Sequence, residues 1–292
     1  MKNLKYLALG LIAMLFASCD DKNVEYNYVP QDESKIAKYQ LYYVVPCVSG
    51  SASNIYESVI NGVSYVNNGA ALLARYNAIP SGLANIFYTT TPGTNTIQLY
   101  QSSKLTKVYD NSCELSTGEN TVWVYDFTKA PAVFKETTPP ANLQTEDPEV
   151  TGAVFKFYNF MYASQSADGT LTPIDYKLQV MLMKEGGKST NDDDYEPYGE
   201  PIAFGECTDW FVKNVKKTVH NSSGYSTQRF GFRKIVNGVD EGWATYTNAN
   251  GKETIMRNIT ITGYFGRAYR RFIYGIADNK TLTVGVAGLV AR

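Results

Sequence analysis

The chain has 292 residues, with 27 lysines and arginines against 28 aspartates and glutamates, so its formal net charge is −1 at pH 7. A surface this close to neutral has no electrostatic attraction for a nucleic-acid backbone, and we expect no nucleic-acid partner. The single histidine and the absence of Cys-x-x-Cys spacing exclude the common zinc sites, and the sequence indicates no metal and no other cofactor.

The first 19 residues have the pattern of an export signal. Two lysines lie within residues 1–5, an apolar run follows over residues 6–16, and Ala17 and Ser18 precede Cys19. The run is too short to span a bilayer as a helix. The pattern resembles a bacterial lipoprotein signal, which implies a signal peptide over residues 1–18 and acylation of Cys19. Ordinary signal-peptidase cleavage, which would leave a soluble secreted protein, is the alternative.

The residues after Cys19 bear on location. Asp20 and Asp21 resemble the surface-export signals of lipoproteins in the Bacteroides group, which implies a lipid anchor in the outer membrane with the protein exposed at the cell surface. The periplasmic face is the alternative. Residues 19–37 are polar, contain Pro30 and show no period, so we expect the acylated cysteine to be followed by a tether.

Residues 38–135 are predicted to form a first β-sandwich domain. Asn61-Gly62 indicates a hairpin, because these two residues adopt the positive φ angles of a type I′ turn. About seven short runs rich in Tyr, Val, Ile and Thr match the spacing of an immunoglobulin-like sandwich. The runs cover residues 39–45, 58–66, 71–79, 83–90, 96–101, 112–115 and 121–127.

Residues 136–151 are predicted to be a linker, because they are rich in proline and acidic residues. Residues 152–292 then form a second predicted β-sandwich domain. No stretch holds a helical period beyond a turn or two, so the fold class is all-β. The strand-like runs of this domain cover residues 153–160, 176–183, 210–219, 227–236, 243–247, 255–262, 269–276 and 281–290.

The two regions are similar to each other at their ends. Each begins with an aromatic strand, Tyr42-Tyr43-Val44-Val45 or Phe155-Lys156-Phe157-Tyr158, and each ends with two strands around a glycine turn. In this arrangement the chain resembles the tandem immunoglobulin-like modules of unassigned function in Bacteroides-type surface lipoproteins, which are described as candidate cell-adhesion proteins. The resemblance implies a fold and a setting and carries over no catalytic residue.

Three sets of residues could carry chemistry. His220 is followed by Asn221-Ser222-Ser223-Gly224 and is expected in an exposed turn. The acidic residues 192–196 could supply oxygen ligands for calcium but lack the alternating spacing of a calcium loop, so a solvated loop is favoured. Cys47 and Cys113 could pair in a disulfide, although buried free thiols are favoured.

Aromatic residues are the remaining candidates for binding. Trp210 and Phe211 are adjacent, so in a strand they face opposite sides. Residues 184–199 are expected to form a mobile hairpin tip without strands. We therefore predict that Tyr195, Tyr198 and Trp210 contact a ligand.

Two functions follow from these patterns. The first is a lipid-anchored, non-catalytic adhesion or interaction protein of the cell surface, with a protein or glycan ligand. The alternative is a glycan-binding lipoprotein accessory to a polysaccharide-uptake system, because flat aromatic rings stack on sugars. An enzyme is not expected, since no pair of carboxylates can be nominated from spacing.

Overall fold

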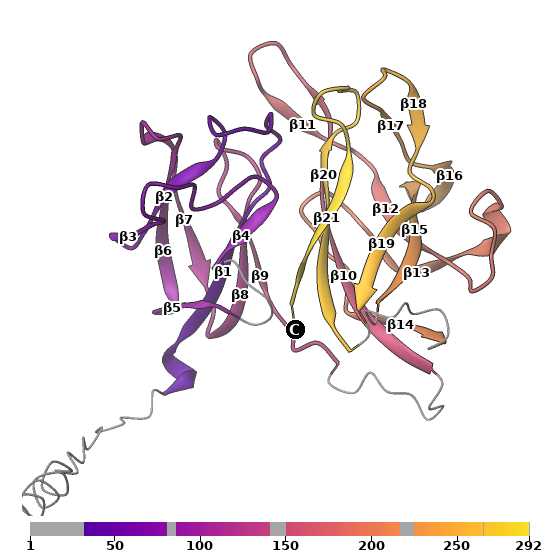
Figure 1. Cartoon of the computed structure of the whole chain (residues 1–292), viewed down its shortest axis with the longest axis horizontal. Coiled ribbons are helices and arrows are strands. Elements are labelled where there is room, and N and C mark those ends of the chain that lie inside the picture. The colour runs from indigo at the N-terminus through magenta and orange to yellow at the C-terminus, as the bar shows by residue number, and fades with distance from the viewer. Residues whose placement is uncertain (1–31, 81–85, 141–149, 217–224, 265, 292) are drawn as a thin grey trace, which may run out of the picture. The chain divides into compact units, whose positions relative to one another are not determined.

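The computed structural model describes residues 32–80, 86–140, 150–216, 225–264 and 266–291, and residues 33–292 group as one compact unit. Within the described residues the chain is all-β, which confirms the expected class (Figure 1). The two short 3-10 turns there are η1 (Glu33–Lys35) and η2 (Asp192–Asp194).

The first half of the unit is a sandwich of two sheets. Its inner sheet contains β1 (Ala37–Tyr43), β4 (Asn77–Ile79), β5 (Tyr88–Thr90), β8 (Gly118–Val124) and β9 (Ala132–Lys135). Its outer sheet contains β2 (Ile55–Ile60), β3 (Val63–Val66), β6 (Gly93–Gln101) and β7 (Thr106–Leu115). Leu41 and Val122 of the inner sheet share a fully buried core with Ile97 and Leu99 of the outer sheet.

The second half repeats this plan. Its inner sheet contains β10 (Val150–Gln165), β11 (Leu171–Pro173), β14 (Phe211–Lys216), β20 (Ala268–Ile276) and β21 (Gly285–Val290). Its outer sheet contains β12 (Lys177–Met183), β13 (Tyr195–Ile202), β15 (Tyr225–Val236), β16 (Val239–Trp243) and β19 (Ile259–Tyr264), and β17 (Thr245–Thr247) pairs with β18 (Glu253–Ile255). Phe155 and Phe157 pack against Phe230 and Phe232 in the core between the sheets.

Both sandwiches share an unusual pairing. The first strand of each inner sheet runs parallel to the strand before last, β1 beside β8 and β10 beside β20. That strand then pairs antiparallel with the last one, β8 with β9 and β20 with β21. In each sandwich, the aromatic strand that begins the region therefore lies beside the strand that follows the glycine turn near its end. An immunoglobulin sandwich has two antiparallel sheets, so the parallel pair departs from that fold.

The two inner sheets also pack on each other. Trp123 is fully buried, with its ring centroid 3.8 Å from that of Tyr42 in its own sheet and 4.5 Å from that of Tyr158 in the other. Phe160 and Phe272 complete this cluster. We call the packed surface the inter-sheet interface. Since both faces of the inner sheets are covered, their central strands read as continuous aromatic and apolar runs.

Local turn signals were predicted correctly. Asn61 and Gly62 have φ angles of 49° and 79° in the loop between β2 and β3, which confirms the hairpin. Asn237 and Gly238 make the same kind of turn between β15 and β16.

Some expected boundaries were wrong. The run over residues 71–79 forms a strand only from Asn77, because the residues before it are turns and bridges. The insertion at 184–199 is not strandless, because β13 begins at Tyr195 and pairs with β12. The predicted domain limits remain predictions, although Glu136, placed in the linker, is buried.

Candidate functional site

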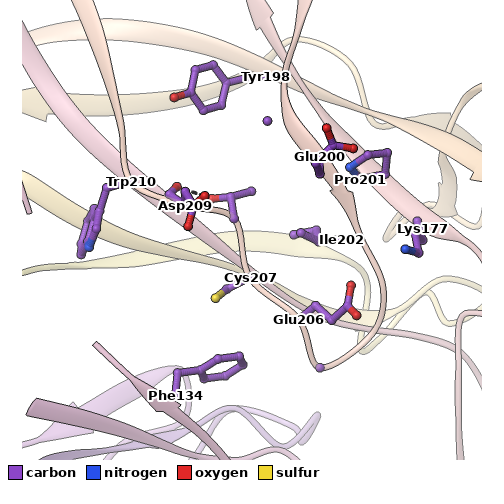
Figure 2. Close-up of a pocket in the computed structure, with 13 residues that line it drawn as sticks. Phe134, Lys177, Tyr198, Glu200, Pro201, Ile202, Glu206, Cys207, Asp209 and Trp210 are labelled. Atoms are coloured by element: carbon purple, nitrogen blue, oxygen red, sulfur yellow. Dashed lines mark hydrogen bonds between the residues drawn. The ribbon is translucent and has the colours of Figure 1, made fainter. Parts of the chain in front are cut away.

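An open pocket of about 750 Å³ lies beside β13 and the loop that follows it (Figure 2). We call it the Trp210 pocket. Its wall combines two aromatic rings of the second sandwich with three carboxylates, one lysine and one ring from β9 of the first sandwich. The lining residues are Phe134, Lys177, Tyr198, Gly199, Glu200, Pro201, Ile202, Gly205, Glu206, Cys207, Thr208, Asp209 and Trp210.

The loop over residues 203–210 is fixed to β10 by backbone hydrogen bonds. The backbone N–H of Asn159 donates to the Glu206 carbonyl (2.9 Å), and the backbone carbonyl of Asn159 accepts from the Gly205 N–H (2.7 Å). The Thr208 amide donates to the Phe157 carbonyl (2.9 Å), and the Thr208 hydroxyl accepts from the Phe157 amide (3.0 Å). These contacts hold the loop against β10 and so fix the positions of its pocket side chains.

Trp210 is held from two directions. Its indole N–H donates to the Thr137 carbonyl (3.0 Å), which follows β9 of the first sandwich. The Lys156 ammonium and the Arg270 guanidinium each lie 5.7 Å from its ring centroid. Cations at this distance are attracted to an indole face. Trp210 is therefore half-buried, and these contacts hold its ring in place against the pocket.

The cations under Trp210 belong to a buried charged cluster. Glu136 accepts hydrogen bonds from the Thr121 and Tyr158 hydroxyls, both at 2.6 Å. Its other oxygen lies 3.1 Å from the Lys156 ammonium and 3.6 Å from Arg270 Nε. All three charged side chains are nearly inaccessible to solvent.

The electrostatics of this cluster are dominated by burial and by the opposite charges. Burial alone would raise the pKa of Glu136, but Arg270 and Lys156 outweigh it and the pKa is lowered. Burial raises the pKa of Tyr158 well above its ordinary value, and the Glu136 charge adds to the effect. Tyr158 thus remains a hydrogen-bond donor to an ionised carboxylate, and the cluster carries two positive charges against one negative charge.

Tyr198 forms the opposite aromatic part of the pocket. Its ring centroid is 3.6 Å from that of Phe211, which is buried in the core of the second sandwich. Gln179 donates to the backbone carbonyls of Tyr198 (2.8 Å) and Gly199 (3.1 Å) and fixes the strand there. Burial raises the pKa of Tyr198, and the Asp209 charge raises it further, so its hydroxyl stays protonated at neutral pH.

The carboxylates of the pocket are exposed. Glu200, Glu206 and Asp209 all face solvent, and Glu206 accepts a hydrogen bond from the Ala203 amide (2.8 Å) that closes its own turn. Exposed carboxylates can accept hydrogen bonds from ligand hydroxyls.

The structure brings together two of the three predicted ligand contacts. Tyr198 and Trp210 line the same pocket, and Phe211 faces the core on the opposite side from Trp210, as predicted. Tyr195 lies elsewhere, buried with its ring centroid 5.0 Å from that of Trp243. Lys177 and Glu200 were missed, because nothing in their local sequence separates them from other strand residues.

The acidic residues at 192–194 are bonded to other groups of the protein, although none of them is buried. Asp192 bonds the Arg257 guanidinium and lies 3.9 Å from that of Arg233. Asp194 accepts from the Lys188 amide (2.8 Å). Among the described residues no group of three or more His, Cys, Asp or Glu side chains is placed to hold a metal.

Other predicted residues fall outside the pocket or outside the described ranges. Cys19 and His220 lie beyond the described residues. Cys47 and Cys113 are free thiols rather than a disulfide, and they are half-buried rather than fully buried. Cys207, which does line the Trp210 pocket, is also a half-buried free thiol. In the part of the chain that the structure describes, no helix has the length and apolarity needed to cross a bilayer.

Comparison with known proteins gives little. No protein-family model and no curated protein matches the chain. Among solved structures, a leucine-rich repeat protein from Bacteroides thetaiotaomicron matches with 12% identity and a TM-score of 0.20, over 85% of this chain and 27% of that one. The chain thus spans about a quarter of that protein's length, and a likeness this low carries no conclusion about fold or function.

Proposed function

We propose that this protein is a non-catalytic binding protein, anchored at the cell surface through Cys19, and that it holds a carbohydrate in the Trp210 pocket. The observation that carries the proposal is the pairing of two positioned aromatic side chains, Tyr198 and Trp210, with exposed carboxylates in one open pocket. Aromatic faces stack on the apolar face of a sugar ring, and carboxylates accept hydrogen bonds from its hydroxyls.

The size of the pocket supports a small or narrow ligand. Its volume of about 750 Å³ falls within the range of ligand sites, roughly 300–1,000 Å³. A flat protein interface would need a broad apolar centre. The geometry therefore favours the glycan over the protein as the ligand left open by the sequence.

The biological setting has two versions. In the first, the two tandem β-sandwiches form an adhesion module that attaches the cell to glycans on another surface. In the second, the same pocket serves as an accessory site of a polysaccharide-uptake system. The lipid anchor and the outer-membrane location are part of both versions. In both, the protein binds a glycan without catalysing a reaction on it.

A glycan array probed with the full-length chain tests the proposal. We expect binding to at least one glycan, weakened at least tenfold by Tyr198→Ala and by Glu200→Gln. Glu253→Gln is the matched control, because Glu253 is exposed on β18 and does not line the pocket. Binding only to proteins, or glycan binding that neither pocket variant changes, would refute the assignment. Release of shortened sugars from the bound glycan would show an enzyme instead.

A further inference from the structure

A second open pocket adjoins the Trp210 pocket. It has a volume of about 820 Å³ and is lined by residues of β12, β13, β15 and β16, by Asp175 and Tyr176 just before β12, and by the exposed turn Asn237-Gly238. Lys177, Glu200 and Pro201 line both pockets, so the two are contiguous. We call the second one the Tyr176 pocket.

The new pocket again offers a positioned aromatic ring. Tyr176 is half-buried, and the Lys234 ammonium lies 5.1 Å from its ring centroid. Burial raises the pKa of Tyr176 to about 12, with the Asp175 charge adding to the effect, so the hydroxyl is a donor at neutral pH. Tyr176 precedes β12, whereas Tyr198 pairs with Val180 of the same strand. Four residues along a strand correspond to about 13 Å, so the two aromatic groups are spaced along one line.

The charges along this line have one dominant sign. Asp175, Glu200, Glu206 and Asp209 line the two pockets as exposed acids, while Lys177 is the lysine that both share. Asp240 also lines the second pocket, but it is paired with Arg233 (Oδ2 to Nε, 2.6 Å). A groove with excess negative charge repels an anionic polymer.

We infer that the two pockets form one extended groove, in which the Tyr176 pocket is a further subsite for a neutral oligosaccharide of several units. This inference rests on the proposed function and names the ligand class of the same site. Each pocket has the volume of a complete small-ligand site, so together they exceed the need of a single sugar. The four exposed acids disfavour acidic polysaccharides, and a basic peptide is the competing occupant.

The inference predicts a dependence of affinity on chain length. The probes for calorimetry on the full-length chain are neutral gluco-, xylo- and manno-oligosaccharides of one to six units, oligogalacturonates of the same lengths, and an oligolysine peptide. We expect the affinity for one neutral series to rise about tenfold or more beyond two units and then level off. Tyr176→Ala should remove this rise and leave the affinity for the shortest bound sugar unchanged.

Matched variants separate this inference from the proposed function. Tyr198→Ala should weaken sugars of every length, and Tyr56→Ala, on β2 of the first sandwich, should change nothing. Affinity that does not depend on length, or that Tyr176→Ala leaves unaltered, would overturn the second subsite while the Trp210 pocket stands. Binding of oligogalacturonate as tight as that of neutral sugars would overturn the charge argument. Binding of oligolysine alone would overturn both proposals.

Discussion

Replacing Glu136 with glutamine is expected to lower the free energy of unfolding by about 3–5 kcal/mol, the usual cost of leaving a buried charge without its partner. Glutamine preserves the size of the side chain and can still accept a hydrogen bond. Among the described residues it removes the one carboxylate paired with Lys156 and Arg270, which are 7% and 2% exposed. The change leaves two buried like charges, so we expect a loss near the upper end of that range.

Equilibrium urea unfolding of residues 33–292 at pH 7 measures this loss. An ordinary domain has about 5–15 kcal/mol of stability, so the variant should be near the limit of folding. Glu253→Gln, an exposed acid on β18, is the control and should change stability by less than about 0.5 kcal/mol. The triple variant Glu136→Leu, Lys156→Met, Arg270→Met should recover much of the loss, because it removes the charges together. A loss below about 1 kcal/mol for Glu136→Gln would refute the reasoning.

The same residue gives a pH dependence. The pKa of Glu136 is lower in the folded protein than its ordinary value, so the unfolded chain takes up a proton first as the pH falls. The stabilisation from ionised Glu136 is therefore complete above the ordinary glutamate pKa, about 4.3. It is lost as the pH falls through the lower pKa that Glu136 has in the folded protein. The difference in stability between the wild type and Glu136→Gln should shrink on acidification, and a constant difference down to pH 3 would contradict this sign.

Three further outcomes are expected. Burial raises the pKa values of Cys113 and Cys207 to about 11, so iodoacetamide at pH 8 should modify both slowly until urea is added; modification at the rate of a free thiol would contradict this. Asp192→Asn should cost no more than about 1 kcal/mol in thermal or urea unfolding, because this carboxylate is half-exposed, and a larger loss would show that its arginine contacts hold the insertion. Labelling with a tagged palmitate should mark the wild type and not Cys19→Ala, and equal labelling would refute the lipid anchor.

Local features of the fold could be predicted from the sequence. The Asn61-Gly62 turn depends on the φ preferences of two residues, and such preferences act without the rest of the chain. Strand existence followed from runs of β-branched and aromatic residues, since these fit a pleated surface. The alternation of β8 is less simple than a half-buried strand, because the Trp123 ring lies in the inter-sheet interface while Val122 and Val124 face the core of the first sandwich.

The inter-sheet interface itself was missed for a physical reason. Tyr42-Tyr43-Val44-Val45 is continuously apolar, which is typical of a strand covered on both faces, but the run does not specify the covering element. Glu136 follows β9 within a stretch rich in proline and acids, so composition favoured a solvated linker. Its partners Lys156 and Arg270 lie on strands of the other sandwich. Their proximity depends on pairing across the whole chain.

The candidate site was predicted only in its aromatic part. Trp210 was predicted as a contact because it and the adjacent Phe211 face opposite sides of a strand, and Tyr198 because it lies in the insertion; both line the pocket. Tyr195 was nominated with them because the insertion was expected to lack strands. Once β13 begins at Tyr195, alternation along the strand places that side chain and Tyr198 on opposite faces.

The position of Trp210 links the pocket to the inter-sheet interface. Its ring lies over Lys156 and Arg270, its indole N–H is bonded to Thr137 beyond β9, and the pocket wall also contains Phe134 of β9. The pocket is thus complete only while the two inner sheets are packed together. If packing is weakened, the apparent affinity falls in proportion to the packed fraction, because only that fraction can bind. By the same linkage, the proposed ligand bound against Trp210 would stabilise the packed state, and the charged cluster would then act on binding without touching the ligand.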